Sequence, residues 1–151
     1  MHPGPNSRRK SRVVCYGRDE YLLTSRSLVL ETRFHTTVAA DLDSLKSQLT
    51  AGCDLVVLCH SLGMTELNRA CELVRSASPA TLLLRLVLNT SSLSPSPCRE
   101  TFLMYDGPAA LVTRVSELLA AGRKRTALGP AAVTSLALCA DQRKARLPAA
   151  P

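Results

Sequence analysis

A chain of 151 residues with 46% hydrophobic residues fits one globular domain with short tails. No apolar run approaches the roughly 18 residues of a membrane span, and no apolar segment follows the basic amino terminus as in a signal peptide. These features exclude a membrane-spanning or secreted class, so we expect a cytoplasmic protein that does not contact a membrane.

The net charge of +7 lies at the two ends of the chain. Residues 1–12 carry four basic residues and no acidic one, and residues 123–151 carry six basic residues and one acidic one. Residues 13–122 carry nine basic and eleven acidic residues, and no aromatic residues alternate with the basic ones. We interpret the basic ends as solvated tails, with weak nucleic-acid binding through them as an alternative.

This distribution predicts three segments along the chain. Residues 1–11 are rich in proline, glycine and charge, which predicts a disordered tail. Residues 12–122 form the predicted domain. Residues 123–151 form a second basic tail, mostly disordered, with a short helix within 133–143 as an option.

Six cysteines are spread along the sequence without the CxxC spacing of a zinc site. Most have apolar neighbours, so we expect reduced thiols that act as small hydrophobic side chains, and no bound metal. The cysteines are Cys15, Cys53, Cys59, Cys71, Cys98 and Cys139.

Apolar runs and helical spacings alternate in the predicted domain. The runs predict strands at 12–16, 34–39, 55–59, 82–89 and 101–105. The spacings predict helices at 20–32, 42–51, 65–76 and 106–121, with Asp19 and Asp41 as helix caps and Gly52 as the end of the second helix. Such alternation predicts a parallel sheet covered by helices on both faces. The segment 89–100 is dense in serine and proline, so no ordinary helix is expected there.

Two stretches carry a family resemblance. DLVVLCHSL at 54–62 resembles the third strand of a response-regulator receiver domain, and FLMYDGPAALVTRVSELL at 102–119 resembles its fifth strand and last helix. The resemblance extends over about 12–123. It implies a three-layer, flavodoxin-like (βα)5 fold, here with a shortened or missing fourth helix and parallel strand order 2-1-3-4-5.

The resemblance also implies which residues occupy the family's phosphorylation site. Cys59 takes the place of the phospho-accepting aspartate, Tyr16 and Gly17 that of the metal-binding acidic pair, Thr90 or Ser91 that of the hydroxyl residue, and Met104 or Tyr105 that of the lysine. The phospho-accepting aspartate, the acidic pair and the lysine of the family are thus all replaced by residues of other types. The sequence therefore predicts a receiver-like protein without phosphotransfer, catalytic residues, metal or cofactor, and hence not an enzyme.

Two functions stay open. The first is a signalling module in a phosphorelay-type pathway that binds other proteins, or a second copy of itself, through its first helix or through its last helix and fifth strand. The alternative is a small-ligand or thiol-based redox sensor that uses the crevice at Cys59, with Cys15 at the end of the neighbouring strand. A catalytic pair of Cys59 and His60 is disfavoured, because sequence neighbours on a strand point to opposite sides.

Overall fold

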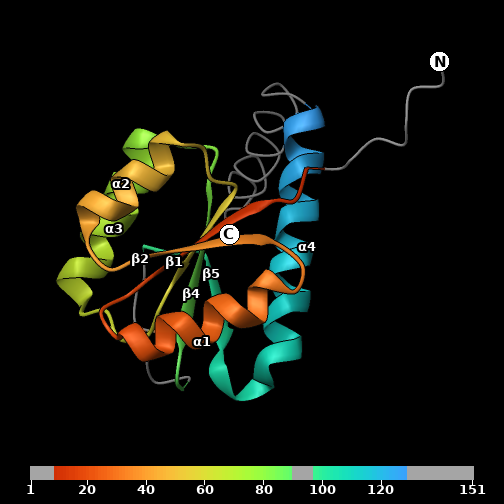
Figure 1. The fold of residues 1–151 in the computed structure, drawn as a ribbon. Helices are drawn as coiled ribbons and strands as arrows, with labels where there is room; N and C mark the ends of the chain where they lie inside the picture. Colours follow the sequence, from red (N-terminus) through yellow and green to blue (C-terminus); the bar gives the residue numbers. More distant parts are fainter. Residues whose placement is uncertain (1–8, 90–96, 129–151) are drawn as a thin grey trace, which may run out of the picture. The chain divides into compact units, whose positions relative to one another are not determined.

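The computed structural model describes residues 9–89 and 97–128 (Figure 1). Five parallel strands form one sheet in the order β2-β1-β3-β4-β5, which confirms the predicted order 2-1-3-4-5. The strands are β1 (Arg12–Tyr16), β2 (His35–Ala39), β3 (Leu55–Leu58), β4 (Leu82–Val87) and β5 (Glu100–Leu103).

Helices cover both faces of the sheet, as right-handed crossovers require. They are α1 (Glu20–Glu31), α2 (Leu42–Thr50), α3 (Met64–Ala77) and α4 (Gly107–Leu128). The buried apolar residues of α1 and of α4 up to Leu119 belong to one apolar cluster with one face of the sheet. Those of α2 and α3 belong to a second cluster on the opposite face, which gives three layers (Figure 1).

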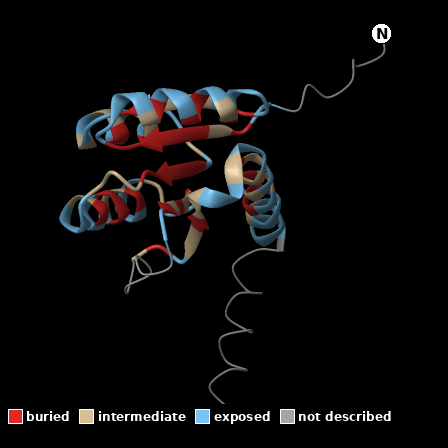
Figure 2. Ribbon diagram, turned by 90° about the horizontal axis from the view of Figure 1, so that it is seen from below, coloured by how far each residue is buried: buried red, intermediate tan, exposed pale blue. Residues whose placement is uncertain are grey.

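Strand β3 lies at the centre of the sheet and is buried on both faces. Leu55 and Val57 belong to the α1 cluster, and Val56 and Leu58 belong to the α2–α3 cluster. All four side chains are fully buried, which is why this strand is an uninterrupted apolar run. Figure 2 shows the buried strands between helices whose outward faces are exposed.

Both predicted helix caps are confirmed. The Asp19 carboxylate accepts a hydrogen bond from the Leu22 amide at 3.0 Å, and the Asp41 carboxylate accepts one from the Ser44 amide at 2.7 Å. Gly52 follows α2 with φ of +94°, a conformation that glycine adopts without a steric penalty.

The structure corrects several predicted boundaries. Met104 and Tyr105 are not in β5, which ends at Leu103; they lie in the 3₁₀ turn η2 (Met104–Asp106). The last helix continues past Ala121 to Leu128, into the segment assigned to the basic tail, and its residues from Ala120 to Leu128 belong to a second compact unit.

Between β4 and β5, the described residues 88–89 and 97–99 contain no helix, in agreement with the shortened or missing fourth helix. Thr90, Ser91, most of both basic tails and the optional helix within 133–143 lie outside the described residues. No helix in the described part of the chain is both long and apolar enough to cross a bilayer.

Candidate functional site

The carboxyl ends of β1 and β3 bring together two of the positions that the resemblance assigns to a phosphorylation site. Tyr16 pairs with Leu58 in the sheet, so the next residues, Gly17 and Cys59, are neighbours. A Cβ atom on Gly17 would lie 2.8 Å from the Cβ of Cys59 and 3.2 Å from the Oγ of Ser61. The chain approaches so closely here that only glycine fits at residue 17, and no carboxylate could replace it without moving Cys59.

Tyr16 faces away from Cys59. Successive side chains on a strand point to opposite faces, and Tyr16 belongs to the α2–α3 cluster whereas Cys59 belongs to the α1 cluster. The Tyr16 hydroxyl donates to the Glu66 carboxylate at 2.8 Å, and Arg18 Nε donates to the same group at 2.7 Å. The structure therefore separates the two residues in the acidic-pair positions: Gly17 touches the acceptor position, and Tyr16 does not.

The Cys59 thiol is poorly suited to redox sensing. Its side chain is 2% exposed, and burial raises its pKa although the neighbouring Arg26 guanidinium acts in the opposite direction. A thiol that reacts without a second sulfur in contact with it is exposed and has a lowered pKa. Cys15 lies opposite Val57 in the sheet, and burial likewise raises its pKa. The alternative function thus lacks the accessible thiolate that it needs.

Arg26 is the site residue that the sequence analysis missed. It projects from α1, is 6% exposed, and donates from Nη2 to His60 Nδ1 at 3.0 Å. Its Nε and Nη1 donors have no acceptor among the described residues. A signal existed: Arg26 follows Leu23 by three residues and precedes Leu30 by four, so it is in phase with the buried face of the helix.

Arg26 also determines the state of His60. A guanidinium has donors only, so His60 Nδ1 accepts and the ring is neutral with its proton on Nε2. Burial and the positive charge of Arg26 lower the pKa of His60. Nδ1 is therefore occupied by the guanidinium and Nε2 carries the proton, so neither ring nitrogen is available as a base for Cys59.

Met104 and Tyr105, the positions that the resemblance assigns to the family's lysine, carry no positive charge. Met104 lines an apolar cavity of about 200 Å³ together with Arg26, Leu22 and Phe102, and Tyr105 is 81% exposed. Arg26 on α1 places a positive charge beside Cys59 at this end of the sheet. No group of three His, Cys, Asp or Glu side chains in the described part of the chain could hold a metal ion. Asp19, a carboxylate whose charge acts on both Cys59 and His60, caps α1.

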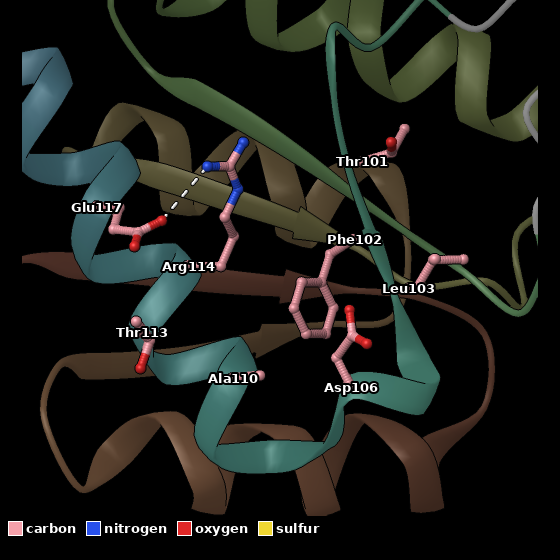
Figure 3. A pocket seen from close by; sticks show the side chains of 8 residues that line it. All are labelled: Thr101, Phe102, Leu103, Asp106, Ala110, Thr113, Arg114 and Glu117. Carbon is pink, nitrogen blue, oxygen red and sulfur yellow. Dashed lines mark hydrogen bonds and ion pairs between the residues drawn. The ribbon is translucent and has the colours of Figure 1, made fainter.

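A second concave region lies between β5 and α4 (Figure 3). We call it the β5–α4 groove; its volume is about 630 Å³. Arg114 forms ion pairs with Glu100 at 2.6 Å and with Glu117 at 3.4 Å. The groove is lined by Thr101, Phe102, Leu103, Asp106, Ala110, Thr113, Arg114 and Glu117.

Glu66 provides a test of the cluster around Tyr16. Burial of its carboxyl group opposes ionisation, but hydrogen bonds from Arg18 and Tyr16 prevail and lower its pKa below the usual 4.5. A lowered pKa stabilises the fold above about pH 4.5, and this contribution is lost as the pH falls through the folded-state value. We expect the free energy of unfolding of Glu66→Gln to decline less between pH 5 and pH 3 than that of the wild type, measured by urea denaturation. The exposed Glu72→Gln serves as control and should follow the wild type; parallel curves for all three proteins would contradict the assignment.

The fold belongs to the flavodoxin-like class, a parallel sheet of order 2-1-3-4-5 between two helical layers. Within that class, solved structures show the receiver fold in particular. The signal receiver domain of an HD domain-containing protein from Pseudomonas fluorescens Pf-5 matches with a TM-score of 0.66 and 12% identity, over 81% of this chain and 96% of that one.

A response regulator from Thermotoga maritima matches with a TM-score of 0.63 and 18% identity, over 74% of this chain and 98% of that one. The chemotaxis response regulator CheY4 of Vibrio cholerae matches with a TM-score of 0.61 and 16% identity, over 72% of this chain and 98% of that one. No family model and no curated protein sequence matches the chain. The predicted receiver fold is confirmed.

Proposed function

We propose that this protein is a signalling module with a receiver fold that acts without phosphorylation, by binding other proteins. The observation that carries the proposal is the carboxyl end of β1 and β3, where Gly17 is packed against Cys59 under the buried guanidinium of Arg26. The module needs no cofactor and is not an enzyme. We assign it to the cytoplasm and to a phosphorelay-type pathway.

The chemistry of phosphoryl transfer supports this reading. Transfer to a receiver requires an acceptor carboxylate and a divalent cation, held by further carboxylates, that neutralises the phosphoryl charge. Here the acceptor position carries a thiol, and the adjacent space is closed at Gly17. A cation would also meet the positive charge of Arg26, which repels it.

Labelling with a small phosphodonor tests the absence of phosphorylation. The full chain is incubated with acetyl phosphate and Mg²⁺, and intact mass is measured. We expect no phosphoryl adduct on the wild type and none on Cys59→Asp, because that substitution restores the acceptor without the metal ligands. A stable adduct on any aspartate of the wild type would overturn the proposal.

The β5–α4 groove supports a protein-binding role. In the described structure, β5 pairs only with β4, so its other edge leaves backbone groups available to a partner. Arg114 and Glu117 add charges of both signs, and the exposed ring of Tyr105 lies on the turn that follows β5. Tyrosine and arginine are over-represented among the residues that contribute most to protein interfaces.

Variants of this surface test the binding role. We expect proteins retained on the immobilised wild type to be lost from Tyr105→Ala and from Arg114→Glu. They should be kept on Tyr21→Ala, whose ring is equally exposed but lies on α1. Sedimentation of the same variants shows whether the partner is a second copy of this chain. Equal retention by all variants would contradict this surface as the binding site.

A further inference from the structure

Two buried cysteines from distant parts of the chain are in contact. Cys71 lies on α3 and Cys98 lies just before β5, and their Sγ atoms are 3.0 Å apart. Both side chains are nearly inaccessible, at 0% and 5% exposure. A disulfide bond is about 2.05 Å long, so an approach of about 1 Å would join the two sulfur atoms.

The surroundings hold this pair in place. Arg75, one turn after Cys71, donates to the backbone carbonyl of Pro97, next to Cys98. The hydrogen bond with Cys98 and then burial raise the pKa of Cys71, while the positive charges of Arg75 and Arg85 act in the opposite direction. The Arg85 Nη1 donor is buried without an acceptor among the described residues. The hydrogen bond and burial prevail, so both sulfurs are held as thiols, and the 3.0 Å contact between the two sulfur atoms is what favours a bond between them.

We propose that Cys71 and Cys98 form a reversible disulfide that fastens the start of β5 to α3, with a hydroperoxide as the oxidant. The assignment is independent of the proposed binding function. It differs from the redox alternative considered for Cys59, since it uses another pair on the opposite face of the sheet.

The reaction balances with hydrogen peroxide. The sulfur of Cys98, the more exposed of the two, attacks one peroxide oxygen; the O–O bond breaks, water leaves, and a sulfenic acid forms. The sulfur of Cys71 then attacks the Cys98 sulfur, the S–O bond breaks, and a second water leaves. The two thiols together lose two electrons and two protons, and one peroxide becomes two waters. A dithiol reductant reverses the step by thiol–disulfide exchange.

The other described cysteines are placed differently. The Cys53 thiol donates to the backbone carbonyl of Leu55 at 3.2 Å. Cys15 and Cys59 lie on the α1 face, where the residue opposite Cys15 is Val57 and not Cys59. Oxidation should therefore be selective for one pair.

Thiol counting and peptide mapping test the proposal on the full chain. The reduced protein is treated with a small excess of hydrogen peroxide at pH 8, and thiols are counted after denaturation. We expect the count to fall from six to four. A tryptic digest without reductant should contain residues 70–75 linked to residues 86–99, and dithiothreitol should separate them. Closing this loop should also raise the melting temperature by roughly 5–10 °C.

Single substitutions provide the controls. Cys71→Ser and Cys98→Ser should each abolish the linked peptide and the rise in melting temperature, with circular dichroism confirming that each variant is folded. Cys53→Ser should behave as the wild type. The proposal would be overturned if all six thiols remained after peroxide treatment, or if the linked peptide joined any other two cysteines. Both measurements use the wild type, so they decide the question even if a serine variant fails to fold.

Discussion

Replacing Gly17 with serine is expected to lower the free energy of unfolding by about 2 kcal/mol, in the range for overpacked interiors. The new Cβ would lie 2.8 Å from the Cβ of Cys59, an atom fixed by the backbone that cannot rotate away. The reduced entropy of the unfolded chain offsets only about 0.5 kcal/mol of this cost. Urea denaturation followed by circular dichroism measures the change.

Gly63→Ser is the matched control for this substitution. Gly63 precedes α3 as its N-cap, and a Cβ there meets no atom within 4 Å. Serine is also a favourable N-cap residue, so we expect Gly63→Ser to leave the stability unchanged or to raise it by about 0.5 kcal/mol. Similar stability of the two variants would show that residues 17 and 59 are not in close contact.

Replacing Arg26 with methionine is expected to raise the free energy of unfolding by about 1–2 kcal/mol, because a buried charge without full hydrogen bonding is often less stable than an apolar group of similar size. Arg26 is 6% exposed and two of its donor atoms have no acceptor in the described structure. The lost hydrogen bond to His60 is compensated in part by water, since this ring is only half-buried.

The same variant changes the chemistry of Cys59. The Arg26 guanidinium lowers the pKa of this thiol against the effect of burial, so removing it should raise the pKa further and slow alkylation of Cys59 by iodoacetamide. Arg33→Met, an exposed position after α1, should change neither stability nor alkylation. Destabilisation of Arg26→Met by more than 1 kcal/mol, or unchanged alkylation, would contradict the role given to Arg26.

Local patterns were sufficient to predict most elements of the fold. The caps at Asp19 and Asp41 depend on one side chain and an amide three residues away, so the sequence contains all that is needed. The end of β5 was predicted less well. Met104 and Tyr105 continue an apolar run but turn into a 3₁₀ segment, because the chain must enter α4 at this point.

The candidate site was predicted in part. The sequence by itself determined the residue types at 16, 17, 59, 104 and 105, which include no carboxylate and no lysine. The sequence could not reveal which side chains surround these positions. The residues in contact are far apart in the sequence: Arg26 and His60 are separated by 34 positions, Tyr16 and Glu66 by 50, and Cys71 and Cys98 by 27.

Contacts of this kind depend on how the helices are placed on the sheet. Helical spacing shows that Arg26 and Cys71 face inward, but the strand order and register decide which side chains they meet. The sequence therefore determined a receiver-like sheet whose residues 16, 17, 59, 104 and 105 include no carboxylate and no lysine. Only the tertiary structure decided that a guanidinium lies beside Cys59, that Gly17 is packed against the same residue, and that two thiols meet on the opposite face.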